Sequence, residues 1–316
     1  MSIDRMRVRV TGIEQVAPKI REFRLQAVEG ELLPFSPGSH VVVEMPATPR
    51  PHRNAYSLLS DPRDASSYRI AVRLQEQSRG GSRYMHEQVQ MGDELTITPP
   101  ANFFAPSWQA SRHLLIAGGV GITPFMSYLP EMERRGADFE LHYLYRSSQT
   151  GAYQEQLRAQ LGERCHCYDS EAGVRCDLQQ LLGAQPLGTH VYICGPESLL
   201  AGVRETAQAL GWPQSHVHFE AFAAPQPGNS FEVELARSGK TLTVDGETSL
   251  LEALEEADVP VTSLCRGGVC GQCRTPVLQG EIEHHDEFLS AAEREKGDCI
   301  MPCVSRAKGE RLVLDI

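Results

Sequence analysis

The sequence lacks several features that would mark a membrane-bound, secreted or nucleic-acid-binding protein. It has no run of about 18 apolar residues, and no apolar segment of the kind found in signal peptides follows Met1. It also has no excess of basic residues, because 30 Lys and Arg face 41 Asp and Glu for a net charge of -11. We therefore expect a soluble, cytoplasmic protein that binds neither membranes nor nucleic acid.

A disulfide framework is disfavoured on similar grounds. Nine cysteines are an odd number in a chain of 316 residues without a signal peptide, so metal ligation plus spare reduced thiols is the better interpretation. Cys165, Cys167 and Cys176 are expected to be spare. A metal site at Cys165-His166-Cys167 would lack a second ligand pair.

Four other cysteines have the spacing of a metal site. Three lie in one short loop as C-x4-C-x2-C and a fourth follows after 29 residues, which is the ligand arrangement of a plant-type [2Fe-2S] cluster. Glycines inside the loop would let backbone amides approach inorganic sulfide. Zinc sites usually pair two short knuckles, and the second is absent here. Cys299 could supply the last ligand, but the 29-residue interval favours the set Cys265, Cys270, Cys273 and Cys303.

The pattern of apolar and polar residues predicts three folded regions. Short alternating strands separated by Pro and Gly predict an antiparallel β-barrel in residues 1–108. Alternating strands and helices predict an α/β domain with a parallel sheet in residues 109–224. A Pro- and Gly-rich linker is expected at residues 225–230, and residues 231–316 begin with a hairpin and a capped helix.

The predicted parallel sheet carries a candidate dinucleotide site. A buried strand at residues 114–117 runs into Gly118-Gly119-Val120-Gly121, and Thr123-Pro124 then begins a helix. Bare amides and the positive end of a helix dipole at such a turn suit a pyrophosphate. This is not the GxGxxG fingerprint, because Thr123-Pro124 replaces the third glycine.

Two polar segments inside the predicted barrel are candidates for binding a flavin. Arg53, Tyr56 and Ser57 offer a cation for a phosphate, an aromatic ring and a hydroxyl for the ring edge. After a further strand, Arg79-Gly80-Gly81-Ser82 offers a second cation, bare amides and a hydroxyl. Either segment alone would be an ordinary strand or loop, but together, ahead of a cluster loop, they predict a flavin site.

These motifs occur in the order seen in the phthalate dioxygenase reductase family. The chain resembles that family, which includes the vanillate demethylase reductases within the wider ferredoxin reductase-like group, over essentially its whole length. The resemblance is carried by Arg53-x-x-Tyr56-Ser57, the loop 118–124, Cys194-Gly195-Pro196 and the cluster loop. The common form of the first motif is Arg-x-Tyr-Ser, so the spacing here is one residue longer.

The resemblance implies a flavin-binding barrel, an α/β nicotinamide domain and a β-grasp ferredoxin domain. It implies that Ser57, Cys194 and Phe222 act where hydride passes from nicotinamide to flavin, and that Arg266 beside Cys265 faces the flavin edge. The flavin would be held by Arg53, Tyr56, Ser57, Ala71, Val72, Arg73, Gly80, Gly81 and Ser82. The nicotinamide cofactor would be held by Gly118, Gly119, Gly121, Thr123, Pro124, Arg146, Cys194, Gly195 and Pro196.

The resemblance also implies a function. An NADH-dependent reductase would pass electrons through FMN and a [2Fe-2S] cluster to a separate Rieske-type mono- or dioxygenase, since the Rieske ligand pattern is absent from this chain. A flavin is needed because nicotinamide gives two electrons together and the cluster takes one at a time. Domain order favours FMN over FAD. Family resemblance favours NADH, although Arg146 could meet a 2'-phosphate. One chain would hold every redox centre, so a monomer would suffice.

Two alternatives stay open from the sequence alone. One is a free-standing NAD(P)H diaphorase, and the other is a non-enzymatic redox-sensing or metal-binding module, which the presence of all the motifs argues against. Charge favours a protein acceptor with a basic docking face. Residues 230–316 hold 17 Asp and Glu against 9 Lys and Arg, a balance of -8 that leaves -3 for the first 229 residues.

Overall fold

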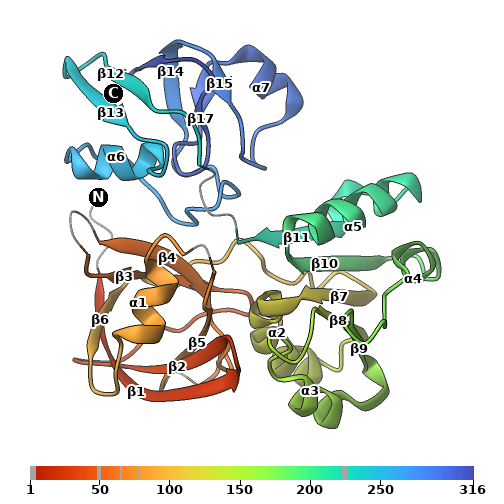
Figure 1. Ribbon diagram of the computed structural model, residues 1–316. Coiled ribbons are helices and arrows are strands. Elements are labelled where there is room, and N and C mark those ends of the chain that lie inside the picture. The colour runs from red at the N-terminus through yellow and green to blue at the C-terminus, as the bar shows by residue number, and fades with distance from the viewer. Residues whose placement is uncertain (1–4, 48–50, 65, 77, 223–226) are drawn as a thin grey trace. The chain divides into compact units, whose positions relative to one another are not determined.

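The structure is a computed structural model that describes residues 5–47, 51–64, 66–76, 78–222 and 227–316. Its contacts divide the chain into two compact units, one up to Phe222 and one after it. The first unit contains an antiparallel and a parallel sheet, and the second contains a mixed sheet (Figure 1). No helix in the described ranges is long and apolar enough to cross a membrane.

The first sheet is the predicted antiparallel barrel. Its six strands follow the order β4-β3-β6-β1-β2-β5, and the end strands β4 and β5 approach each other. Alternation along β3 sends Val41, Val43 and Met45 into the barrel core. Helix α1 packs against β3, β4 and β5. The elements are β1 (Met6–Ala17), β2 (Ile20–Ala27), β3 (His40–Met45), β4 (His52–Ser57), β5 (Tyr68–Arg73), α1 (Gly81–Glu87) and β6 (Glu94–Ile97).

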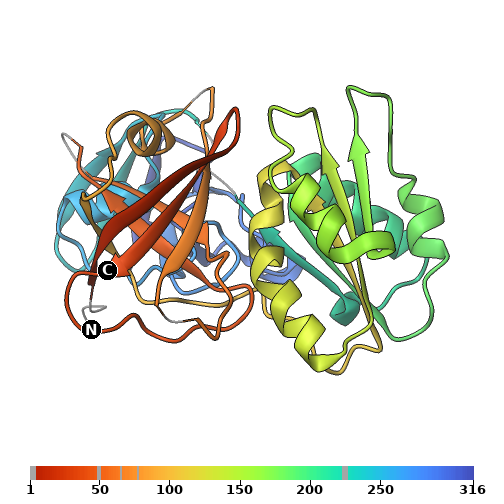
Figure 2. The same cartoon turned by 90° about the horizontal axis from the view of Figure 1, so that it is seen from below.

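The second sheet of this unit is parallel, in the order β11-β10-β7-β8-β9. Helices α2 and α3 pack on one face and α4 and α5 on the other (Figure 2). Helix α2 begins at Thr123, as predicted, with Pro124 in its first turn where a missing N–H costs least. The elements are β7 (Arg112–Gly118), α2 (Thr123–Arg135), β8 (Phe139–Tyr145), α3 (Gln154–Leu161), β9 (Cys165–Asp169), α4 (Leu178–Gly183), β10 (Thr189–Gly195), α5 (Glu197–Ala209) and β11 (Val217–Ala221).

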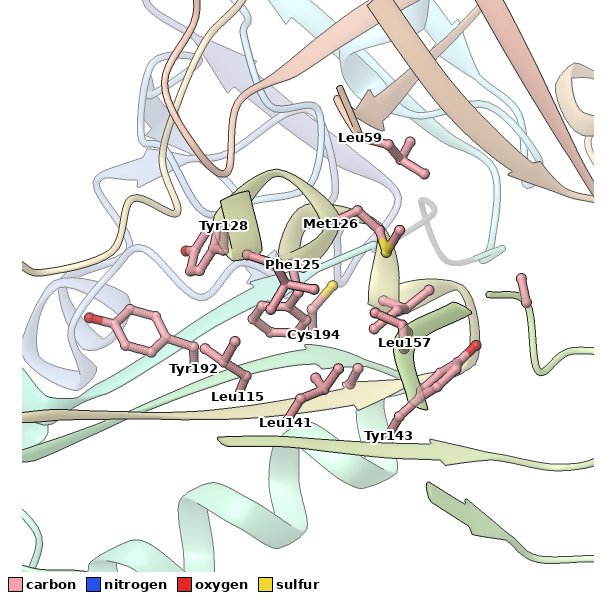
Figure 3. Close-up of a cluster of buried hydrophobic side chains, with 14 of the residues drawn as sticks. Leu59, Leu115, Phe125, Met126, Tyr128, Leu141, Tyr143, Leu157, Tyr192 and Cys194 are labelled. Atoms are coloured by element: carbon pink, nitrogen blue, oxygen red, sulfur yellow. The ribbon is translucent and has the colours of Figure 1, made fainter. Parts of the chain in front are cut away.

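The barrel and the parallel sheet share one hydrophobic core. Figure 3 shows Phe125, Met126 and Tyr128 of α2 in this core, beside Cys194 of β10. Leu59, which follows the barrel strand β4, belongs to the same buried cluster. This shared core explains why contacts group the two sheets as a single unit.

The second unit is a five-stranded mixed sheet in the order β13-β12-β18-β14-β16, covered by α6. Ser249 caps α6 by accepting a hydrogen bond from Glu252 N while the Glu252 side chain accepts one from Ser249 N, which confirms the predicted capping box. The elements are β12 (Phe231–Leu235), β13 (Lys240–Val244), α6 (Leu250–Glu256), β14 (Thr275–Gln279), β15 (Ile282–Glu283), α7 (Ala291–Lys296), β16 (Cys299–Ile300), β17 (Arg306–Ala307) and β18 (Arg311–Leu314).

The predicted fold classes of all three regions are confirmed: an antiparallel barrel, a parallel α/β sheet and a β-grasp arrangement. The boundary between residues 108 and 109 stays a prediction, because contacts join the first two regions. The linker predicted at 225–230 also stays a prediction, and its residues 225 and 226 lie outside the described ranges.

Candidate functional site

Tyr56 lies on β4, where it packs partly against the barrel core. Its hydroxyl accepts a hydrogen bond from Asn54 Nδ2 at 3.1 Å, and burial raises the pKa of Tyr56 to about 12. Asn54 and Tyr56 are two residues apart and so share one face of the strand. Arg53 lies on the opposite face, where its Nε donates to Glu44 Oε2 at 2.9 Å. The structure therefore places Asn54 next to Tyr56 and Arg53 on the other face of β4, and the role of Arg53 toward the flavin phosphate stays a prediction.

The predicted glycine loop lies against this same face of β4. A Cβ atom at Gly81 would lie 2.5 Å from Asn54 Nδ2, and one at Gly80 would lie 2.1 Å from His52 Nε2. Gly80 also has a φ of 114°, which side-chain-bearing residues rarely adopt. Gly80 consequently requires glycine, whereas a side chain at Gly81 would displace the Asn54 amide from its present position. The loop residue Ser82 is buried and its Oγ donates to Ser78 Oγ at 2.9 Å.

The other predicted flavin residues lie on β5. Ala71 and Val72 are buried, while Arg73 is exposed at the end of the strand. The carbonyl of Val72 lies 2.8 Å from His86 Nε2 of α1, so β5 is tied to the helix that begins with the glycine loop. The predicted flavin residues on β4 and β5 therefore lie next to α1, which begins within the predicted glycine loop.

A buried hydrogen bond joins the barrel to the parallel sheet. Ser57 Oγ, at the end of β4, donates to Glu220 Oε2 of β11 at 3.2 Å, and the two residues are only 3% and 8% exposed. Glu220 pairs in register with Cys194 of β10. Burial, and then the charge of Glu220, raises the pKa of the Cys194 thiol well above its usual value. Ser57 and Cys194, both predicted to be catalytic, thus meet at one carboxylate.

The sequence patterns did not single out Glu220. The signal that could have found it is a lone acidic residue in a strand that otherwise belongs to a buried sheet, since charged side chains are rarely buried without a role. Phe222, the third predicted catalytic residue, follows β11 and is 41% exposed. That exposure excludes an ordinary core position. Its contact with a flavin stays a prediction.

Glycines bring the ends of β7 and β10 into backbone contact. A Cβ atom at Gly121 would lie 2.1 Å from the carbonyl oxygen of Cys194, and one at Gly118 would lie 2.6 Å from Pro196 Cδ. A Cβ atom at Gly195 would lie 2.9 Å from the Cα of Gly118. Side chains at these positions would force the two strand ends apart. The predicted segments 118–124 and 194–196 therefore form one continuous surface.

That surface lies at the carboxyl ends of the parallel strands, where such sheets bind ligands. Gly119 has a φ of 55° and faces open space. Residues 119–122 form a short 3-10 helix ahead of α2, and Thr123 Oγ1 fixes the turn by donating to Val120 O at 3.0 Å. Bare amides at the start of a 13-residue helix suit the pyrophosphate of a dinucleotide.

Arg146 lies just past the carboxyl end of β8, and its side chain is highly exposed. The structure adds an acidic neighbour there, because Glu171 Oε1 lies 3.7 Å from Arg146 Nε. Glu171 comes from the turn after β9, so its approach depends on the sheet order rather than on local sequence. A carboxylate at this position is a candidate acceptor for ribose hydroxyls.

The four predicted cluster ligands lie together in the second unit. Cys273 Sγ is 3.4 Å from Cys303 Sγ, and the thiols of Cys265 and Cys270 interact with each other and with this pair. Cys299 instead contacts Arg274 and Asp298. The geometry therefore favours Cys303 as the fourth ligand.

The loop that carries these cysteines fits an iron-sulfur cluster. Gly267 N donates to Cys265 Sγ at 3.4 Å, and the backbone of Gly268 donates to Cys303. Amide hydrogen bonds to sulfur are one of the means by which proteins set cluster potentials. Gly268 and Gly271 have φ values of 74° and 71°, and a Cβ atom at either would clash with a neighbouring side chain. The loop thus needs its glycines.

Arg266, next to the ligand Cys265, has a partner within the second unit. Its guanidinium makes two hydrogen bonds to the carboxylate of Glu255 on α6, at 2.6 and 3.1 Å, and its side chain is largely buried. Arg266 is also a non-glycine residue with a φ of 53°. The paired guanidinium therefore anchors a strained loop to α6, while its predicted position facing the flavin stays a prediction.

Three family models match the chain. They are described as an oxidoreductase FAD-binding domain (residues 7–105), the N-terminal domain of a dimethylamine monooxygenase subunit DmmA-like family (residues 94–217) and a 2Fe-2S iron-sulfur cluster binding domain (residues 233–308). The matched ranges coincide with the barrel, most of the parallel sheet and the second unit. The barrel therefore matches a flavin-binding family and the second unit a [2Fe-2S]-binding family, as expected from the sequence.

Curated relatives match the chain from end to end. The heme-dependent oxidative N-demethylase beta subunit of Ectopseudomonas mendocina (strain ymp) is 55% identical over 98% of both chains. The carnitine monooxygenase reductase subunit of Escherichia coli (strain K12) is 45% identical over 98% of both chains. Among solved structures, phthalate dioxygenase reductase has a TM-score of 0.85 and 33% identity, with 99% of this chain and 98% of that chain covered.

Fold, site and comparisons define an oxidoreductase that joins a flavin domain and a nicotinamide domain to a [2Fe-2S] domain. More narrowly, the chain belongs to the phthalate dioxygenase reductase family. It is a reductase component that passes electrons to an oxygenase.

Proposed function

We propose that the chain is the NADH- and FMN-dependent reductase of an oxygenase that acts on N-methylated amines. The observation that carries this proposal is the 55% identity, over 98% of both chains, to the beta subunit of a heme-dependent oxidative N-demethylase. The match of residues 94–217 to a dimethylamine monooxygenase family supports the same substrate class. The relative that is named a carnitine monooxygenase reductase subunit also supports this class, because carnitine is a quaternary methylammonium compound.

Two kinds of oxygenase are candidates for the electron acceptor of this chain. A haem-containing oxygenase is the first, from the name of that N-demethylase relative. A Rieske-type oxygenase, expected from the sequence, is the second, and the end-to-end structural match to phthalate dioxygenase reductase favours it. In both cases the acidic second unit would dock on a basic face of the acceptor, in the cytoplasm.

Domain order supports FMN, and the residues near Arg146 support NADH. Domain order favours FMN, with Tyr56 against the ring, Ser57 at its edge and the Gly80-Gly81-Ser82 loop toward its phosphate. Glu171 beside Arg146 favours NADH, because a carboxylate accepts from a ribose 2'-hydroxyl and repels a 2'-phosphate. A bound flavin would supply the exchange between hydride and single-electron transfer.

The chain's own residues would prepare the hydride-transfer site. Glu220 fixes the Ser57 hydroxyl from a position that is almost closed to water. Burial keeps the Cys194 thiol protonated, because its pKa lies well above the usual value, so Cys194 would present a neutral surface to the nicotinamide. In the second unit, loop amides would stabilise the charged sulfur ligands of the cluster.

An anaerobic NADH titration followed by visible absorption tests the electron path. Flavin and cluster bands that bleach together support it, and a colourless protein would overturn it in favour of a sensing or binding module. Mass analysis of the released flavin decides between FMN and FAD. Repeating the titration with NADPH decides the nicotinamide, since comparable rates with both would contradict the role proposed for Glu171.

Reconstitution tests the acceptor. The reduced protein is mixed with a haem-type N-demethylase partner subunit and, separately, with a Rieske oxygenase, and the reduction of each acceptor is followed by its own spectrum. Fast reduction of the haem protein alone supports the first candidate, and fast reduction of the Rieske protein alone supports the second. Reduction of neither, with dyes still reduced by NADH, would indicate a free-standing diaphorase.

A further inference from the structure

A polar cluster on the parallel sheet lies outside the proposed redox path. Strands β8 and β9 pair in parallel with His142 directly opposite His166. Glu140 is two residues from His142 and therefore shares its face of the sheet. The ligand-type atoms of Glu140, His142 and His166 all lie within 4.8 Å of one another. We propose that these three residues bind a zinc ion.

The buried imidazole of His142 is the first argument. His142 is only 4% exposed, and among the described residues its Nε2 is a buried nitrogen without a hydrogen-bond partner. This nitrogen lies 3.5 Å from Glu140 Oε1. Zinc bonds of about 2.0–2.1 Å in a tetrahedron place neighbouring ligand atoms roughly 3.4 Å apart. The separation of these two atoms is therefore that of two ligands on one ion.

The second argument is that the remaining polar atoms of His142 and Glu140 already have hydrogen-bond partners. His142 Nδ1 lies 2.9 Å from the hydroxyl of Tyr168, which leaves Nε2 for the ion. Glu140 Oε2 accepts from Arg112 Nη2 at 2.8 Å, which fixes the carboxylate with Oε1 toward His142. Outer partners of this kind orient the ligands in established metal sites. Gln185 Nε2 adds a third restraint by donating to Glu140 Oε1 at 2.8 Å.

His166 must adjust before it binds. Its ring stacks on that of His142 with centroids 4.6 Å apart and an angle of 21°, and nearly parallel rings do not aim their nitrogens at one point. His166 is exposed, so a rotation of its side chain meets no packed core. Two imidazoles and one carboxylate are borderline ligands that suit zinc rather than magnesium or calcium.

The zinc ion would stabilise the parallel sheet and would take no part in electron transfer. β9 is the last strand of the parallel sheet in the described residues, and it is paired only with β8. An ion held by Glu140 and His142 on β8 and by His166 on β9 would tie this edge strand to its neighbour. Ligand binding to the folded state raises the unfolding temperature.

Metal analysis of the holoprotein tests the proposal, with an intact cluster so that its cysteines are not available to zinc. The protein is incubated with zinc chloride, desalted, and assayed for zinc and iron. We expect one zinc per chain in addition to cluster iron, and none above background in His166→Ala or Glu140→Gln. His166 is exposed, so its loss should leave the fold and the NADH-dependent dye reduction intact.

His190→Ala is the matched control, because His190 of β10 likewise stacks on a histidine of the neighbouring strand, His218 of β11. It should bind zinc as the unmodified protein does. Added zinc should raise the unfolding temperature of the unmodified protein and of His190→Ala, but not of His166→Ala. Zinc binding that survives His166→Ala, disappears in His190→Ala, or is absent from the unmodified protein would overturn the proposal.

Discussion

Glu220 shows how one buried charge can organise a site at the scale of single residues. It accepts the hydrogen bond of Ser57 and lies beside Cys194, and no residue near it in sequence supplies either contact. A hydrogen bond to a buried charged group contributes about 1.5–3 kcal/mol. The geometry of Ser57 therefore depends on a residue of another sheet.

Replacing Glu220 by Gln should slow the reduction of the flavin by NADH. The substitution keeps the size but removes the charge that holds Ser57 Oγ, and a loss of about 1.5–3 kcal/mol corresponds to roughly a tenfold to hundredfold decrease in rate. Stopped-flow absorbance of the flavin measures it. Glu205→Gln, an exposed carboxylate of α5, serves as the control. An unchanged rate in Glu220→Gln would contradict the role of Glu220.

Asn54→Ala and Arg53→Ala separate the two faces of β4. Asn54 shares the face of Tyr56 and Gly81, so its loss should weaken flavin binding about 2- to 10-fold, the equivalent of one hydrogen bond. Arg53 is paired with Glu44 on the other face, and its loss should have a smaller effect. Flavin fluorescence during titration of the apoprotein gives both constants. A larger effect from Arg53→Ala would show that Arg53 reaches the flavin after all.

The same residues show what the sequence could predict about the site. The cluster cysteines and the glycine turn follow from spacing along the chain, and the structure brings each set together. Strand alternation alone would have placed the side chains of Arg53 and Tyr56 on opposite faces of β4, because the two residues are an odd number of positions apart. Glu220 and Glu171 were not predictable in this way, because their partners come from strands that are distant in sequence.

At the scale of elements, local signals set the bounds of strands and helices well. The strand predicted at residues 114–117 lies within β7, the helix predicted at Thr123 begins there, and residues 231–316 begin with a hairpin and a capped helix as predicted. The close contact of β7 with β10 was not visible in the sequence, although it explains why the turn needs glycine at residue 121.

Gly121→Ala should therefore destabilise the first unit. The added methyl group would lie 2.1 Å from a backbone oxygen that cannot move aside by rotation, and such overpacking costs about 1–3 kcal/mol. We expect a lower unfolding temperature and weaker NADH binding. Gly183→Ala is the control, since nothing lies within 4 Å of a Cβ atom there. Equal unfolding temperatures for the two variants would refute the argument.

Two histidines near the starts of β10 and β11 should make the stability of the fold depend on pH. His190 Nδ1 and His218 Nε2 lie 2.9 Å apart, and burial, followed by the neighbouring His190, His216 and His113, lowers the pKa of His218 from 6.5 to about 4. The unfolded chain therefore takes up this proton first. The contribution of His218 to stability is complete above pH 6.5 and is lost as the pH falls toward about 4.

His218→Phe should flatten this dependence. Phe keeps the stacking with Tyr192, whose ring centroid lies 4.5 Å away, but it cannot be protonated. We expect the unfolding temperature of the variant to fall less between pH 7 and pH 5 than that of the unmodified protein. Parallel pH curves for the two proteins would show that protonation of His218 is not the cause.

At the scale of the whole molecule, the division into two units predicts separable activities. Cys270→Ser removes one cluster ligand, so reduction of the oxygenase should fall to background. Reduction of ferricyanide by NADH should be largely kept, because every proposed flavin and nicotinamide residue lies in the first unit. Cys176→Ser is the matched control outside the cluster loop. Loss of both activities in Cys270→Ser would argue against independent units.

The hydrogen bond between Ser57 and Glu220 joins residues 163 positions apart, which also has a consequence for biosynthesis. The barrel strands leave the ribosome early, but their contact with the parallel sheet is incomplete until β11 has emerged. The buried clusters of the second unit consist only of residues after 222. Gene fusion that removes or replaces this unit would therefore keep the Ser57–Glu220 hydrogen bond, whereas a chain that ends before residue 220 would lack it.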